Sequence, residues 1–585
     1  MTRVRTPRRL LARLVALLAV PVVLLGGCAT IPTSGEPWVG DVDAAAEADP
    51  RPIVYLPASG PREGAGPEAI VRGFLMAAST GPNNPARFTV ANQFLEPLAV
   101  SAWNPDERVF VMQADPVLTA DPVPEDALTT TVRFSAEVTA TVDERGVLTE
   151  QQVPTPAQAE FTLVKGADGQ WRISELDNGL YLHEVIFTNS YRPVRLYFPT
   201  PDRSYWVPDQ RWFPENGWRA KAVEEVLAGP PAYLQGAAIS VVPEGTGLSI
   251  GAVAENPETG ELEIPLTSQI SGASDADRAL VAAQIGASLA PDGRLTQPVA
   301  LSDGSARLEV RSGAGPSLPR TEGRAVVLTD GTLHRAGDDG RLVEFERETD
   351  WSEVGDPTAL AVGPAATPVV VRDGTSTLRR LTGEPAVLLT GTDLAPPSID
   401  RFSIVWTSGS PGSVVAVTPD GAQVPLTGDW LTGRQVTGVR VSPEGARVAV
   451  VSRSVSGESQ VHVAGVVRDQ AGAPTALAGA VRVAVTVPHV REVQWAGQTY
   501  LGLLTADAGE TSVWVTGVGG YAPDALGRSR ELAGVVGPQR IAAGSNDQGI
   551  HAVDDDGTLV FRRLGEGTWT DLLPGTAVSL VAFPG

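Results

Sequence analysis

Residues 436–452, VTGVRVSPEGARVAVVS, carry the pattern from which we predict the fold of the C-terminal half of the chain. Apolar residues fill both ends of this stretch, and the Ser-Pro-Glu-Gly in its middle is typical of a turn between two antiparallel strands. Similar phrases recur at spacings of about 40–55 residues, a period typical of the four-stranded blades of a β-propeller. These other phrases begin near Ala359, Ile399, Val493 and Arg540.

The sequence predicts a propeller of about six blades over residues 320–585, with five or seven blades as alternatives. A β-sandwich pair or a set of unrelated strands is the alternative fold. Residues 578–583, VSLVAF, read as an innermost strand with no outer strands behind it, so we expect them to complete the blade begun at 323–345 and to remove an open sheet edge. Asp–Gly pairs supply hairpin turns at Asp330-Gly331, Asp339-Gly340, Asp373-Gly374, Asp420-Gly421 and Asp556-Gly557.

Composition limits what else the 585-residue chain contains. The length predicts about three or four domains, and 42% apolar residues are ordinary for packed cores. The formal net charge of −23 argues against nucleic acid as a partner, because phosphate binding needs a basic surface. A single cysteine excludes an intrachain disulfide and any cysteine-based zinc site.

That single cysteine, Cys28, directly follows a predicted export signal over residues 1–27. The signal combines an arginine-rich start without acids and an apolar run from Leu14 that is too short to span a bilayer as a helix. The run ends in Leu25, Gly26 and Gly27, which directly before the cysteine resemble the lipobox of bacterial lipoproteins. This resemblance implies that Cys28 carries a diacylglyceryl group and an N-linked acyl chain such as palmitate after cleavage.

Everything after Cys28 is predicted to lie outside the membrane, because no other apolar run approaches 18 residues. Acyl chains contribute about 0.8 kcal/mol per buried CH₂, so two or three of them hold a protein stably on a bilayer. The expected location is the extracytoplasmic face of the cell membrane, and the expected cofactors are none besides this covalent lipid. The alternative is a buried free cysteine beside a few apolar residues.

Residues 28–66 are rich in Pro, Gly, Ala and acids and predict a flexible, lipidated tether. Residues 67–190 predict an N-terminal α+β domain, because helical patterns come first and alternating strands follow. Helices are expected from Pro67 and over 86–95, and the hairpin at 168–169 resembles one in NTF2-like domains. The expected strands are 108–112, 129–142, 158–164 and 171–176.

Residues 191–315 predict a second α+β domain. Its expected elements are a strand at 194–198, a helix at 220–227, a strand at 261–266, a helix at 275–289 and a strand near Pro298. The phrases LYF, LAGPP and VVPEGTGL in this order resemble the GerMN domain, named from spore germination proteins. The resemblance implies a peptidoglycan-associated or protein-contact module and carries over no catalytic residue.

Motifs for catalysis or metal binding are weak throughout. Residues 247–251, GLSIG, match the G-x-S-x-G nucleophile elbow, but a hairpin pattern follows where the elbow needs a helix. Residues 554–556 are three aspartates without the alternating spacing of a calcium loop, so they read as a turn. Five histidines lack metalloprotease pairing: His183, His334, His462, His489 and His551. We therefore predict a non-enzymatic protein without catalytic or metal-binding residues.

An aromatic stretch in the second domain is the remaining feature. We interpret it as a β-loop packed on the domain's own core, with an exposed partner-binding patch as the alternative, because Trp and Tyr serve both roles. The stretch contains Tyr205, Trp206, Trp212, Phe213 and Trp218.

Taken in order, the lipobox, the domain beginning GPEAIVRGFL, the GerMN-like domain and the terminal propeller resemble the LpqB-type lipoproteins of actinobacteria. Lys165 and Lys221 are the two lysines among 45 basic residues, as expected from a GC-rich genome. The resemblance implies binding to the extracytoplasmic domain of an MtrB-like sensor histidine kinase, with effects on two-component signalling, cell division and envelope homeostasis. The alternatives are a peptidoglycan-binding or envelope-assembly factor without a signalling role, and an extracytoplasmic hydrolase.

Overall fold

The computed structural model describes residues 58–585 except 85, 125, 291–295, 311–314, 321–323, 338–339, 521–528 and 545–548. The predicted lipobox residues Leu25, Gly26, Gly27 and Cys28, and most of the predicted tether, lie outside the described residues. Across the described ranges, no helix has both the length and the apolar character needed to cross a membrane.

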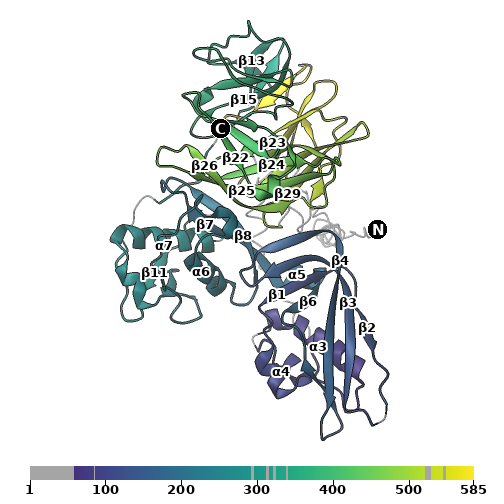
Figure 1. Cartoon of the computed structure of the whole chain (residues 1–585). Helices are drawn as coiled ribbons and strands as arrows, with labels where there is room; N and C mark the ends of the chain where they lie inside the picture. The colour runs from purple at the N-terminus through teal and green to yellow at the C-terminus, as the bar shows by residue number, and fades with distance from the viewer. Residues whose placement is uncertain are drawn as a thin grey trace, which may run out of the picture. The chain divides into compact units, whose positions relative to one another are not determined.

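The N-terminal domain is a mixed α/β unit whose strands form one sheet in the order β5-β4-β3-β1-β6, with β2 paired to β3. Figure 1 shows β3 and β4 as two long neighbouring strands. β1 pairs antiparallel with β3 and parallel with β6. The elements are α3 (Pro67–Ser79), η1 (Gly81–Asn83), η2 (Ala91–Phe94), α4 (Pro97–Ala102), β1 (Arg108–Met112), β2 (Val117–Ala120), β3 (Thr129–Asp143), β4 (Leu148–Lys165), β5 (Trp171–Glu175), β6 (Leu180–His183) and α5 (Glu184–Ser190).

Helix α3 begins at Pro67, as predicted, and buries Ile70, Val71 and Phe74 along one face. The predicted helix over 86–95 is wrong. Arg87 has a φ of 48°, a left-handed conformation that a right-handed helix does not contain, and the following residues form only the 3₁₀ turn η2. The likeness of this domain to NTF2-like domains stays a prediction.

In its described residues, the middle domain contains two small sheets and two main helices. β7 and β8 pair antiparallel along their whole length, and β10 pairs parallel with β11 and antiparallel with β9. The predicted strands and helices of this domain are confirmed, whereas β8 was not predicted as a strand. The elements are β7 (Tyr191–Pro199), β8 (Trp206–Pro214), α6 (Trp218–Ala228), η3 (Ala232–Leu234), β9 (Ala254–Glu255), β10 (Leu262–Pro265), η4 (Ser268–Gly272), α7 (Asp275–Leu289) and β11 (Val299–Ser302).

The hairpin of β9 and β10 also shows whether residues 247–251 form a nucleophile elbow. Leu248 bridges to Leu266, Ser249 lies in a bend, and β9 follows where a nucleophile elbow needs a helix. The G-x-S-x-G match is therefore a chance match, as expected.

In the described part of the chain, the remaining strands form six four-stranded antiparallel sheets, which confirms the six-bladed propeller. Each blade buries apolar residues from its inner strands, because hydrophobic strands pack face to face between neighbouring blades. The Asp330-Gly331 turn between the first two strands has positive φ at both residues, 48° and 73°, as a tight hairpin turn requires.

The six blades follow one another along the chain. The first blade contains β12 (Val326–Thr329), β13 (Thr332–Ala336) and β14 (Leu342–Glu344). The second contains β15 (Pro357–Val362), β16 (Val369–Asp373), β17 (Thr377–Arg380) and β18 (Ala386–Thr390). The third contains β19 (Ser398–Ile399), β20 (Val405–Ser408), β21 (Ser413–Val417) and β22 (Gln423–Thr427). The fourth blade contains β23 (Gln435–Val441), β24 (Arg447–Arg453), β25 (Ser459–Arg468) and β26 (Pro474–Val483). The fifth contains β27 (Val490–Trp495), β28 (Tyr500–Asp507), β29 (Glu510–Gly517) and β30 (Arg530–Glu531). The sixth contains β31 (Arg540–Ala542), β32 (Gly549–Val553), β33 (Leu559–Arg563) and β34 (Thr570–Asp571). Two 3₁₀ turns, η5 (Pro364–Ala366) and η6 (Asp429–Leu431), lie between strands.

The propeller closes through its last strand. β35 (Leu580–Ala582) pairs antiparallel with β12, which completes the first blade in the order β14-β13-β12-β35. Figure 1 shows the yellow end of the chain beside the teal strands of that blade. The predicted closure is confirmed, and it leaves no open edge at β12.

Candidate functional site

Three residues of the aromatic stretch are buried, but only Trp206 and Phe213 lie in clusters of their own domain, as we expected, whereas Trp212 belongs to the apolar cluster of the N-terminal domain. Trp206, Trp212 and Phe213 are 2%, 4% and 2% exposed. Tyr205 and Trp218 are half-buried and lie against arginines, with the Arg401 guanidinium carbon 5.0 Å from the Tyr205 ring centre. The interpretation as an exposed patch is therefore wrong for the three buried residues.

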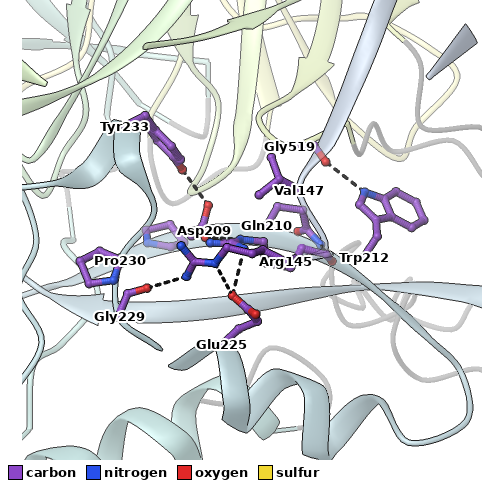
Figure 2. A network of polar contacts seen from close by, with 12 residues as sticks. Arg145, Val147, Asp209, Gln210, Trp212, Glu225, Gly229, Pro230, Tyr233 and Gly519 are labelled. Carbon is purple, nitrogen blue, oxygen red and sulfur yellow. Dashed lines mark hydrogen bonds and ion pairs between the residues drawn. The ribbon is translucent and has the colours of Figure 1, made fainter. Parts of the chain in front are cut away.

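One of these aromatic residues contacts another domain. The indole Nε1 of Trp212 donates a hydrogen bond to the backbone oxygen of Gly519 in the propeller at 3.0 Å, as Figure 2 shows. Trp212 therefore helps to join the middle domain to the propeller. The amino-acid composition of the stretch does not tell this role from packing inside the middle domain.

Arg211 on β8 is fully buried and lies between two carboxylates. Its Nε donates to Asp209 Oδ2 at 2.5 Å, and its Nη1 lies 3.4 Å from Glu225 Oε2 on α6. The same Nη1 donates to the backbone oxygen of Arg145 at 2.6 Å. The other oxygen of Asp209 accepts a hydrogen bond from the Tyr233 hydroxyl at 3.0 Å (Figure 2). These residues form what we call the junction network.

The N-terminal domain enters this network through the hairpin between β3 and β4. Arg145 at its tip donates from Nε to Glu225 Oε2 at 2.8 Å and from Nη2 to the Gly229 oxygen at 3.2 Å (Figure 2). We call the long hairpin of β3 and β4 the ribbon of the N-terminal domain. Farther along it, Gln152 on β4 accepts a hydrogen bond from Arg482 of the propeller at 3.0 Å. The ribbon therefore contacts both other domains.

Burial and charge oppose each other in the junction network. Burial raises the pKa of the Glu225 carboxyl, and the neighbouring Arg145 and Arg211 only partly offset that rise. Burial lowers the pKa of Arg211, but attraction to Asp209 and Glu225 outweighs it, so the guanidinium stays charged. The network thus holds ionised groups away from water, and each depends on its partners for stability.

A second buried arginine joins the middle domain to the propeller. Arg447 on β24 donates to Glu444 at 2.6 Å, to the Gln498 backbone oxygen at 2.8 Å and to the Pro208 backbone oxygen at 3.5 Å. Its guanidinium carbon lies 4.5 Å from the ring centre of Trp495. Because Pro208 directly precedes Asp209 on β8, the two buried arginines contact neighbouring residues of that strand.

Beside these contacts lies a cavity of about 220 Å³ that all three domains line. Thr139 and Leu148 come from the N-terminal sheet, Trp212 from β8, and Thr486 and Gly520 from propeller loops. The walls of this cavity therefore depend on how the three domains pack together.

Gly519→Ala should destabilise the protein by about 1–3 kcal/mol. Gly519 has a φ of 89°, and a Cβ there would lie 2.6 Å from the Cβ of Gln210 in the middle domain. Thermal unfolding measures the effect. Gly509→Ala is the matched control, because its φ of 93° imposes the same backbone strain while no atom lies within 4 Å of the added carbon. Equal losses in the two variants would contradict tight packing at Gly519.

The remaining candidates of the sequence do not come together. Among the described residues, no group of three or more His, Cys, Asp or Glu is placed to hold a metal ion. Asp554 accepts hydrogen bonds from the backbone of Asp556 and Thr558, which makes residues 554–556 the predicted turn. Burial lowers the pKa of His551 to about 3, so this histidine is neutral inside the propeller.

The sequence did not single out Arg211, Asp209, Glu225 or Arg447. One signal was present: Asp209 and Arg211 stand two residues apart between aromatic residues, a spacing that puts both on the same face of a strand. Polar residues in such a strand become core residues only when other domains cover them.

Comparison with known proteins covers most of the chain. The family models described as "Lipoprotein LpqB, N-terminal domain" and "Lipoprotein LpqB beta-propeller domain" match residues 60–188 and 331–584. Between them, the model described as "Sporulation and spore germination" matches residues 195–302.

Individual relatives carry the same name. Lipoprotein LpqB of Bifidobacterium longum is 28% identical over 65% of this chain, and the match spans 65% of that relative's length. Lipoprotein LpqB of Cutibacterium acnes is 25% identical over 97% of this chain and 99% of the relative. A solved structure of TolB from Acinetobacter baumannii is 13% identical, covers 45% of this chain and 66% of that chain, and has a TM-score of 0.33, too low to support an argument.

The matched domains occur in the order that the sequence and the fold indicate, and the full-length relatives share that order from end to end. The chain therefore belongs to the LpqB family of lipoproteins.

Proposed function

We propose that this lipoprotein is a non-catalytic regulator, anchored through Cys28, that binds the extracytoplasmic domain of an MtrB-like sensor histidine kinase. In this proposal, binding modulates two-component signalling and, through it, cell division and envelope homeostasis. The partner comes from the resemblance of the sequence to the LpqB-type lipoproteins, and the fold supports a binding role.

The junction network is the observation that supports binding over catalysis. Buried ionisable groups are often catalytic, but here Arg211, Asp209 and Glu225 bind one another inside the middle domain, and Arg145 of the N-terminal domain pairs with Glu225. These charges join the middle domain to the ribbon of the N-terminal domain, and Arg447 and Trp212 join the middle domain to the propeller. A multidomain body of this kind presents a large surface to a protein partner.

Membrane anchoring favours such a partner. A lipid anchor confines the protein to two dimensions, which raises its effective concentration near the outer domain of a membrane-bound sensor. The acidic charge keeps the body soluble beside an anionic membrane, and loss of the five arginines of the export signal makes the mature chain more acidic still.

A pull-down tests the proposal. The chain carrying Cys28→Ala, which lacks the lipid, is passed at micromolar concentration over the immobilised outer domain of the kinase, and specific retention is expected. Residues 58–190 and 191–585 are then tested separately. This division follows the apolar clusters, because the middle domain and the propeller share one, while the other belongs to the N-terminal domain except for Tyr191 and Trp212.

Failure of every form to bind the kinase domain would contradict the signalling proposal. Co-sedimentation with insoluble peptidoglycan in the same buffer would then support the alternative of a cell-wall binding or envelope-assembly factor. Binding to both would retain the kinase proposal and add the cell wall as a second partner.

Cys28→Ala should also abolish labelling of the protein by a radioactive or clickable fatty acid and move it from the membrane to the soluble fraction, or leave the signal uncleaved. The physical reason is that the thiol is the acceptor for the lipid. Fractionation and labelling in the native host measure both effects, with wild-type protein as the control. Persistent labelling would show that Cys28 is not the modified residue.

A further inference from the structure

The channel at the centre of the propeller is lined by its innermost strands, which include β15, β19, β23, β27, β31 and β35. It contains a cavity of about 70 Å³, where one water molecule needs about 10–15 Å³. The space therefore suits several waters or one small polyatomic ion. Among the described residues that line it, the charged side chains are Arg440, Glu492 and Arg540.

Further arginines gather where the innermost strands begin. Arg540 is the first residue of β31 and Arg491 the second of β27. Arg491 Nη2 and Arg540 Nη1 each lie 3.7 Å from the same Oε1 of Glu492, which is farther than a hydrogen bond. Arg372 is near enough that Arg540 and Arg491 add to the effect of burial in lowering its pKa.

The hydrogen bonds of these arginines leave their charge largely unbalanced. Arg440 donates to the backbone oxygens of Pro396 and Pro397, both at 3.1 Å, and Arg372 donates to the Leu394 oxygen at 2.6 Å. Neutral oxygens satisfy donors without cancelling charge. Burial accordingly lowers the pKa of Arg440 to about 10.

Arg540 also has a donor to spare. Its Nε is buried and has no hydrogen-bond partner in the described part of the structure. An unpaired buried N–H is costly, so an acceptor bound in the cavity would stabilise Arg540. Four arginines therefore surround Glu492, with Asp393 as the other acid that acts on Arg372, in a chain whose net charge is −23.

We propose that this mouth of the propeller channel binds a small oxyanion, a carboxylate or phosphate group, between Arg540, Arg491 and Arg372. The oxyanion accepts charge-assisted hydrogen bonds, including one from the free Nε of Arg540, and balances the excess of guanidinium charge. Glu492 opposes binding, because its negative charge competes for the same two guanidinium groups. The site goes beyond the proposed function, since it needs no protein partner.

Calorimetric titration of the full chain in detergent with inorganic phosphate, and separately with acetate, tests the site. Chloride replaces either anion at constant ionic strength, so that only specific binding is measured. A saturable site with one anion per chain is expected, and the tighter-binding anion identifies the phosphate or the carboxylate class. Arg540→Gln should weaken binding by about tenfold. Glu492→Gln should strengthen it severalfold, an effect that a purely structural cluster would not produce.

Arg563→Gln is the matched control. Arg563 lies on β33 of the same blade, its side chain is 40% exposed, and it pairs with Glu566 on the surface at 3.8 Å. This variant loses the same charge and should bind the anion as the wild type does. If Arg540→Gln does not fold, Glu492→Gln decides alone. Absence of saturable binding, or affinities unchanged by both channel variants, would overturn the proposal.

Discussion

Arg211→Met should lower the free energy of unfolding by about 3–5 kcal/mol, because it leaves the buried Asp209 and the mostly buried Glu225 without their shared cation. Asp209 is only 3% exposed, and Glu225 would keep Arg145 as its one guanidinium partner in the network. Calorimetry measures the loss as a shift of the first unfolding transition. A multidomain chain need not unfold in one step, so that transition is the relevant one.

Arg307→Met is the control for this prediction. Arg307 lies in the same domain and pairs with Glu261 at 2.9 Å, but its side chain is 65% exposed, so the change should stay within about 1 kcal/mol. The pH dependence gives a second readout. Unpaired buried carboxylates have raised pKa values and take up protons on folding, so acidification toward their pKa should restore part of the stability of Arg211→Met. Equal losses for Arg211→Met and Arg307→Met would show that the junction network contributes little.

Removing residues 579–585 should destabilise the propeller by about 3–6 kcal/mol, counting burial of Leu580 and Val581 alone. These side chains are 2% and 9% exposed, and the deletion also removes the ladder between β35 and β12. The exposed edge of β12 is apolar, with Val326, Val327 and Leu328 all buried in the intact protein. Thermal unfolding and size-exclusion chromatography should show lower stability and self-association.

A synthetic peptide of residues 578–585 provides the control for this deletion. Added in trans, it can pair with the free edge of β12 and should raise the unfolding temperature toward the wild-type value. A scrambled peptide of the same composition should have no effect. Wild-type stability of the shortened chain without peptide would contradict the role of β35 in closure.

Local signals explain which elements could be predicted from the sequence. Helix α7 was predicted over its observed bounds, because Ser274 supplies a capping side chain and Asp275 and Asp277 favour the first turn. The blades were predicted because pairs of apolar strands recur at regular spacing, and five of the turns carry Asp–Gly. The helix expected at 86–95 failed because nothing in its apolar spacing reveals the left-handed backbone of Arg87.

The junction could not be predicted, because its partners are far apart in sequence. Arg211 meets Arg145 of the N-terminal ribbon, and Trp212 meets Gly519 of the propeller. In the sequence, the polar residues of β8 look like those of a solvent-exposed loop. Only the packing of three domains makes β8 a buried strand, and this tertiary effect overrides local propensity. The four arginines at the channel mouth could not be predicted for the same reason, because each comes from a different blade of the propeller.

The pairing of β12 with β35 also sets an order of events as the chain is made. β12 emerges early, whereas its partner emerges more than two hundred residues later, about the length of a whole domain. The first blade must therefore wait with an unpaired edge until β35 arrives. A chain interrupted before β35 keeps that edge exposed and remains open to proteases, which limited proteolysis of arrested chains can measure. Pairing of β35 with β12 therefore protects this edge from proteases only in chains that have been made as far as β35.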